Sequence, residues 1–139
     1  MAAYMIQHIK PNLVYIRWTR NSKTADENLF IHELSNLLDN AEEVIYFISD
    51  LRKGRIIGMR AIYKLSQLTQ HEKWAGSTAF SENPISRLFT NNFERNVANH
   101  DANVIYDHPE DAIAYLESLC TGITSNIDWI EILNNPSEE

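Results

Sequence analysis

The stretch that decides the fold is EVIYFIS, residues 43–49. Its apolar side chains follow one another without the alternation of a half-exposed strand, and the run has the length of a strand rather than of a helix. Such a run is typical of a central strand that is covered on both faces of a sheet. The stretch therefore predicts an α/β domain built around it.

Four further segments on either side of this run are predicted strands. YMIQHI and LVYIRWT, residues 4–9 and 13–19, are separated by the turn KPN and predict a β-hairpin. GSTAFS and ANVIYD, residues 76–81 and 102–107, follow the central run. Together the segments predict a sheet of five strands.

Four predicted helices connect and follow these strands, at residues 24–41, 57–71, 83–97 and 108–120. The first opens with T-x-x-E, which predicts a capping box with Thr24 as N-cap and Glu27 at N3. The third begins with Asn83 as N-cap and Pro84 at the first helical position. The order β-β-α-β-α-β-α-β-α predicts one α/β domain, a mixed five-stranded sheet with helices packed on it.

The charge of the chain is unevenly distributed. The 139 residues carry a net charge of −7, which argues against nucleic acid as a partner because phosphate contacts need a basic face. Residues 50–64 nevertheless hold five of the twelve Lys and Arg and only one acid, whereas no Lys or Arg follows Arg95. This asymmetry can orient a protein partner or a second copy of the chain.

The basic segment is the candidate site. It follows the central strand, and the carboxyl ends of strands are where open α/β sheets usually present their sites. The loop DLRKGRIIG also leads into a helix N-terminus, which favours an anion. The candidate residues for binding a partner or an anion are Asp50, Arg52, Lys53, Arg55 and Arg60. A phosphate site, a protein partner surface and a solvated basic edge all fit this pattern.

The element order resembles that of the SpoIIAA-like (STAS-like) domains of bacterial regulators. The resemblance rests on VIYFISDL as the central strand and DHPEDAIAYLESL as the closing strand and helix, and it covers about residues 4–120. It implies a single-domain SpoIIAA-like fold and a regulatory or binding role, such as that of the anti-sigma-factor antagonists. In those antagonists a phosphorylatable Ser or Thr begins the helix after the central strand. The corresponding residues 57–60 contain no hydroxyl group, so phosphorylation is not expected there.

The sequence gives no pattern for catalysis or for a cofactor. It contains no G-x-S-x-G turn, no phosphate-binding G-x-x-x-x-G-K-[ST] loop and no H-x-x-x-H pair. The single cysteine, Cys120, has no second cysteine to pair with. No apolar run reaches about 18 residues, and MAAYMIQHIK does not resemble a secretion signal. We therefore expect a non-enzymatic, cytoplasmic protein without a membrane span, metal or cofactor.

The expected function is that of a regulatory or protein-interaction module without the usual phosphoacceptor. The alternative is a binder of a small anionic or lipid-like ligand, with the helix at 57–71 as a lid. The predicted domain spans residues 1–121, and residues 122–139 form an apolar extension with a short acidic end. Residues 122–133 are too apolar to be left in water, so they either fold back over their own domain or form a homodimer with a second copy.

Overall fold

The computed structural model of the chain describes residues 2–81 and 103–134. Its five strands are β1 (Tyr4–Lys10), β2 (Leu13–Trp18), β3 (Ile45–Asp50), β4 (Trp74–Phe80) and β5 (Asn103–Tyr106). They form one mixed sheet in the order β1-β2-β3-β4-β5, in which β1 and β2 are antiparallel and all later pairs are parallel. The predicted α/β fold with a five-stranded mixed sheet is confirmed, and β3 is its central strand.

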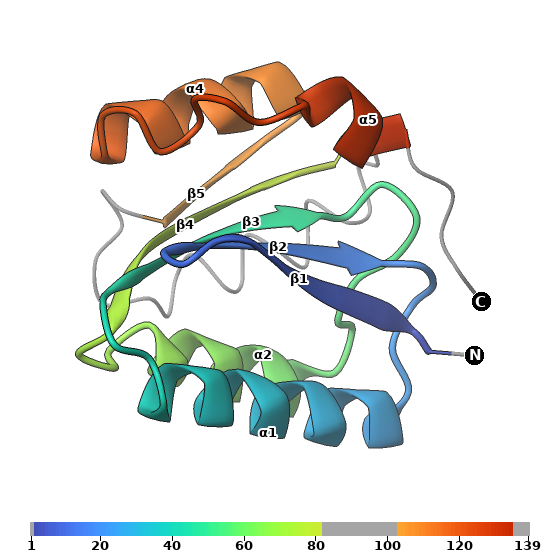
Figure 1. The fold of residues 1–139 in the computed structure, drawn as a ribbon. Coiled ribbons are helices and arrows are strands. Elements are labelled where there is room, and N and C mark those ends of the chain that lie inside the picture. Colours follow the sequence, from blue (N-terminus) through green and yellow to red (C-terminus); the bar gives the residue numbers. More distant parts are fainter. Residues whose placement is uncertain (1, 82–102, 135–139) are drawn as a thin grey trace.

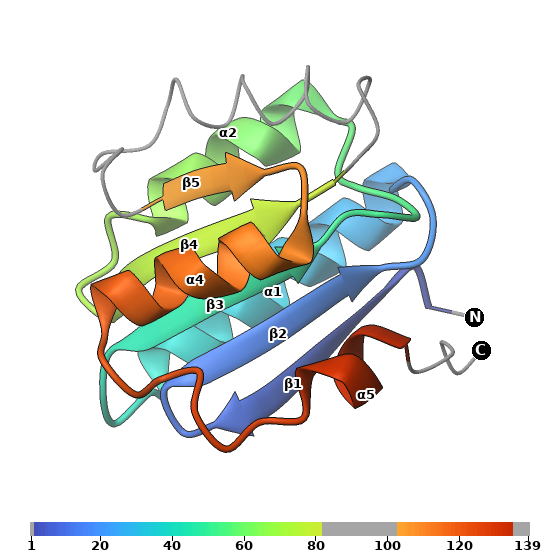
Figure 2. The ribbon, with the colours of Figure 1, turned by 90° about the horizontal axis from the view of Figure 1, so that it is seen from above.

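Helices cover both faces of this sheet (Figure 1). Helices α1 (Thr24–Asp39) and α2 (Met59–Leu68) lie side by side under one face, and α4 (Pro109–Leu119) and α5 (Trp129–Asn134) lie over the other. Seen from above in Figure 2, α4 runs along β3 and β4, whereas α5 lies at the β1 edge of the sheet. The predicted helix at 83–97 lies outside the described residues.

Side-chain alternation along the strands divides the core into two layers. Phe47 and Ile16 face α1 and α2 and pack against Phe30 and Leu34. Tyr15, Ile48 and Phe80 face the other helices and pack against Leu116 of α4. Phe47 and Ile48 are both buried, although they are neighbours in the chain, so β3 is covered on both faces as its continuous apolar run predicted.

The C-terminal extension folds back over its own domain. Ile123 is buried, and Trp129, Ile132 and Leu133 pack against the same layer as Tyr15. The extension contains the short helix α5, which the sequence analysis did not predict. None of the helices within residues 2–81 and 103–134 is long and apolar enough to cross a bilayer.

The predicted capping box of α1 is wrong by one residue. Lys23 is the N-cap, and Asp26 at N3 accepts a hydrogen bond of 2.8 Å from the Lys23 backbone N–H. Glu27 is buried instead, and its carboxylate accepts a hydrogen bond of 2.9 Å from the N–H of Gly58 at the start of α2. The same carboxylate accepts a hydrogen bond of 2.5 Å from the hydroxyl of Ser22, which precedes α1. Asp26 and Glu27 are adjacent acids in the first turn of the helix. The T-x-x-E spacing pointed to Glu27, whereas Asp26 is the residue that occupies N3.

Glu27 therefore caps a different helix from its own. Gly58 is the N-cap of α2, so the carboxylate sits at the positive end of that helix, where it is electrostatically favoured. Two further hydrogen bonds attach the loop before α2 to Ser22, each 3.0 Å long. The Ser22 N–H donates to the Arg55 carbonyl, and the Ile57 N–H donates to the Ser22 hydroxyl. These contacts fix how α2 leaves the central strand.

We expect Gly54→Ala to destabilise the fold by roughly 1–3 kcal/mol, since overpacking a tight contact costs about that much. A β-carbon at Gly54 would lie 2.2 Å from the Arg20 carbonyl carbon, which is backbone and cannot move aside cheaply. Urea unfolding followed by circular dichroism measures the change. Lys53→Ala, at the exposed neighbouring position, is the control and should leave the free energy of unfolding nearly unchanged.

Candidate binding site at the carboxyl ends of β2 and β3

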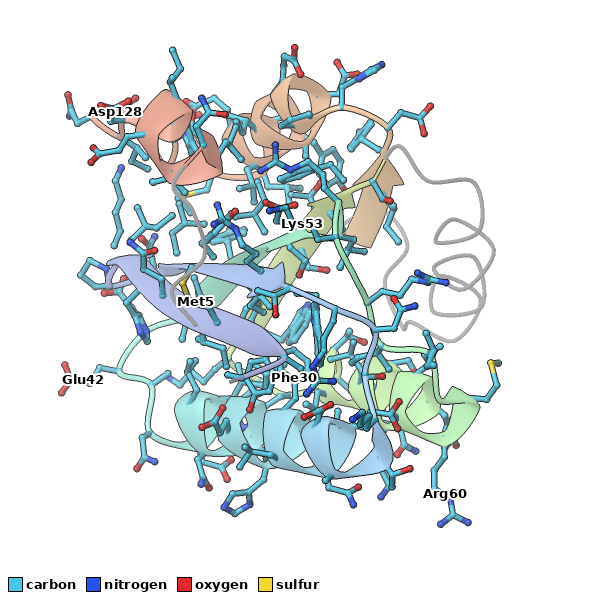
Figure 3. All side chains as sticks on the ribbon, turned by 90° about the vertical axis from the view of Figure 1, so that its right-hand side faces the viewer. Met5, Phe30, Glu42, Lys53, Arg60 and Asp128 are labelled. Atoms are coloured by element: carbon cyan, nitrogen blue, oxygen red, sulfur yellow. The ribbon has the colours of Figure 1, made fainter. Side chains whose placement is uncertain are left out.

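The structure does not gather the five predicted site residues into one cluster. Asp50 ends β3 and is only 3% exposed, whereas Arg52 and Lys53 lie on the exposed loop that follows it. Arg55 is half-buried and donates a hydrogen bond of 2.9 Å to the side chain of Asn21 near α1. Arg60 lies in the first turn of α2 and points away from the fold (Figure 3).

Asp50 is the centre of a buried polar network. Its carboxylate accepts two hydrogen bonds from the Arg52 guanidinium, at 2.7 and 3.0 Å, and one from the Arg52 backbone N–H at 3.1 Å. The Tyr15 hydroxyl donates to the same carboxylate at 2.7 Å. Arg17 Nε lies 3.4 Å from it and donates to the Tyr15 hydroxyl at 3.1 Å. One carboxylate therefore joins β2, β3 and the loop before α2.

The network sets the protonation states of its members. Burial alone would raise the pKa of Asp50, but the hydrogen bonds from Arg52 and Tyr15 outweigh it and hold the pKa below its usual range. Burial and the neighbouring charge of Asp50 raise the pKa of the Tyr15 hydroxyl. At neutral pH the site consequently holds an ionised carboxylate between two guanidinium groups, with Tyr15 as a neutral donor.

Helix α5 closes the site from above. Arg17 Nη2 donates to the Ile132 carbonyl at 2.5 Å, and Arg52 Nη2 donates to the Leu133 carbonyl at 2.6 Å. These carbonyls belong to the last turn of α5, where a helix has no backbone donors of its own to satisfy them. The two arginines therefore complete the C-terminal end of α5, where the helix dipole also favours positive charge.

Tyr15 and Arg17 are members of the site that the sequence analysis did not identify. Arg17 could have been recognised from the sequence, because it is a charged residue between Ile16 and Trp18 in an otherwise apolar strand. A buried arginine requires a charged or hydrogen-bonding partner, so its position predicts that a polar group is near. Nothing in the local sequence says that this group is Asp50, which lies 33 residues further along the chain.

The exposed face of α2 is a second feature, separate from the buried network. Met59 and Tyr63 are each 53% exposed and are one helical turn apart. Arg60 and Lys64 are exposed beside them. We call these four residues the α2 surface; it combines two large apolar side chains with two positive charges.

A third feature is an apolar cavity of about 90 Å³ between the sheet and helices α1 and α2. Its wall is mostly apolar, with Phe47, Trp74 and Ala79 from the sheet and Ile62 from α2. Its polar lining groups are Arg55, Ser49, Ser77 and Thr78. Within residues 2–81 and 103–134, no three His, Cys, Asp or Glu side chains come together as a metal site would require.

Comparison of this fold with solved structures gives two informative matches. The anti-sigma factor antagonist SpoIIAA in its unphosphorylated form is 14% identical with a TM-score of 0.63, over 84% of this chain and 97% of that one. An uncharacterised protein of the DUF3478 family with a SpoIIAA-like fold, from Shewanella loihica, is also 14% identical with a TM-score of 0.56, over 85% and 93%. No protein-family model and no curated protein sequence matches the chain. The chain thus has the SpoIIAA-like fold that the element order implied.

We expect Asp50→Asn to lower the free energy of unfolding by about 3 kcal/mol at pH 7, because breaking a buried ion pair leaves its partners uncompensated. The native carboxylate has a lowered pKa, so its stabilising contribution is complete above the unfolded value of 3.8 and is lost progressively as the pH falls from 3.8 through the lower folded-state pKa. Urea unfolding at pH 7 and pH 3 measures both effects. The difference in the free energy of unfolding between the unmodified chain and the Asp50→Asn variant should be smaller at pH 3 than at pH 7. An equal difference at both pH values would contradict an ionised Asp50 with a lowered pKa.

Proposed function

We propose that this chain is a non-catalytic, cytoplasmic regulatory module that binds a protein partner through the α2 surface and the basic loop before it. The observation that carries the proposal is the pairing of Met59 and Tyr63 with Arg60 and Lys64 on one exposed helical face. Large apolar side chains at the centre of a surface supply most of the binding energy of protein interfaces, while charges beside them favour one class of partner. An acidic protein surface has the matching charge.

The fold supports this proposal at a coarser level. The solved neighbour SpoIIAA is described as an anti-sigma factor antagonist, which is a role carried out on another protein. The present chain has no hydroxyl group at residues 57–60, so we propose a module that works without phosphorylation at that helix start. The boundary between a domain at 1–121 and an extension at 122–139 stays a prediction. Dimerisation through residues 122–133 also stays a prediction, and the exposed Ile130 of this segment is available to a second copy.

A variant of the α2 surface tests the proposal. A photo-crosslinking amino acid at position 63 should capture a protein from native cytoplasm. Adding Arg60→Glu and Lys64→Glu should reduce the captured amount at least tenfold, because both changes reverse charges facing the partner. The melting temperature should change little, since exposed charges contribute about 0–1 kcal/mol each to stability. The matched control places the same crosslinker at Leu29, which is equally exposed on α1; equal capture there would contradict a specific surface.

The second candidate function is binding of a small amphiphilic anion, and the cavity beneath α2 favours it. Its lining is mostly apolar, which suits the apolar part of such a ligand. Arg55 with Ser49 and Ser77 gives the lining groups that could receive an anionic end. Helix α2 would then act as the lid that the sequence analysis proposed.

Filling the cavity tests this second candidate. Ala79→Leu adds three carbon atoms to its wall and should weaken the binding of 1-anilinonaphthalene-8-sulfonate at least tenfold while maintaining or raising the melting temperature. Near-ultraviolet circular dichroism confirms that the dye meets a folded protein. A drop in stability of 1–3 kcal/mol would instead indicate overpacking, and would show that the space is not available to a ligand.

A further inference from the structure

The strongest unassigned feature is the contact between two arginines and the end of α5. Arg17 and Arg52 come from β2 and from the loop after β3, and both contact the carboxylate of Asp50. Each also donates a short hydrogen bond to a carbonyl oxygen of α5. This contact lies across the sheet from the α2 surface, and it shares only Arg52 with the basic loop of the proposed function.

Side chains of the sheet orient the two guanidinium groups. Asp50 binds Arg52 through two parallel hydrogen bonds, which fixes the plane of that guanidinium. The Arg52 guanidinium also lies 5.5 Å from the centre of the Phe80 ring, and the Arg17 guanidinium lies at the same distance from the Tyr15 ring. The side chains that orient the donors therefore belong to the sheet and not to α5. A site held in this way keeps its geometry when its occupant leaves.

Helix α5 is a weak occupant of this site. It has only six residues, none of them is buried, and Ile130 is 75% exposed. Helices this short are not stable by themselves and depend on tertiary contacts. The chain just before α5 is firmly attached, because the Glu117 carboxylate accepts hydrogen bonds from Gly122 and Thr124. Movement of α5 can therefore be confined to residues after Thr124, where Asn126 adopts a left-handed backbone conformation.

The two carbonyl oxygens of α5 are also weaker hydrogen-bond acceptors for the arginines than an anion would be. A backbone carbonyl oxygen carries only a partial negative charge, whereas hydrogen bonds between guanidinium groups and an ionised oxygen are roughly twice as strong as neutral ones. Both guanidinium groups donate to such carbonyl oxygens. A carboxylate or phosphate group is therefore a stronger acceptor for them than the end of α5 is.

We propose that Arg17 and Arg52 form an oxyanion site that α5 occupies in the free protein, and that a carboxylate or phosphate group competes with α5 for it. Binding of the anion is then coupled to release of α5 from the β1–β2 hairpin. Release exposes the apolar layer that Trp129, Ile132 and Leu133 cover. In the free protein the two arginines donate to carbonyl oxygens at the end of α5. The anion takes the place of these carbonyl oxygens.

Hydrogen exchange of the full-length chain tests this coupling. Inorganic phosphate at 1–20 mM, compared with chloride at equal ionic strength, should raise the exchange rates of the amides of residues 130–134 at least tenfold, while the amides of β3 stay protected. Acetate in a parallel series shows whether a carboxylate has the same effect. Arg52→Gln should give fast exchange of α5 without phosphate and no further change with it. Lys53→Gln removes the same charge from the adjacent exposed position and should behave as the unmodified chain.

Three results would overturn the proposal. The exchange of α5 could be unaffected by phosphate and acetate, in which case α5 is a fixed cover. It could rise equally in the Arg52→Gln variant, which would indicate an adventitious ion acting elsewhere. It could also rise together with the exchange of β3, which would show general destabilisation and not release of one helix.

Discussion

The buried carboxylate of Asp50 is the constraint on which the rest of this site depends. It stands at the end of the central strand, where the chain must leave the sheet and enter a loop. An ionised group in that position has to be surrounded by donors, because an uncompensated buried charge costs several kcal/mol. The donors come from its own loop through Arg52 and from the neighbouring strand through Tyr15 and Arg17. The hydrogen bonds that compensate one charge thereby join two strands and the loop after β3.

The fold was predictable because its information is local and repeated. The uninterrupted apolar run of β3, the hairpin before it and the helical spacing in between each indicate the same arrangement, and errors at single residues do not alter it. The capping box illustrates such an error. Asp26 and Glu27 are adjacent acids, and only the direction of the chain before α1 decides which one caps the helix. That direction depends on the loop at 51–58, which lies far away in sequence.

The site was predictable only in part, and for a physical reason. A basic loop after a central strand is visible in the sequence, and Asp50 and Arg52 were identified from it. Their partners were not, because a hydrogen bond between Tyr15 and Asp50 depends on the pairing of β2 with β3, in which Arg17 lies opposite Asp50. The role of α5 was equally hidden. A six-residue helix has too little periodicity to be recognised, and its contacts with the arginines go through backbone carbonyls, which carry no sequence signature.

The position of Glu27 has a consequence for which residues position 58 can accept. A carboxylate from α1 already occupies the space at Gly58, because a β-carbon added to that glycine would lie 2.5 Å from Glu27 Oε1. Any larger residue there would have to push this carboxylate away from the N–H to which it is bound. The start of α2 and the start of α1 are therefore coupled, and a change at position 58 would be felt in both helices.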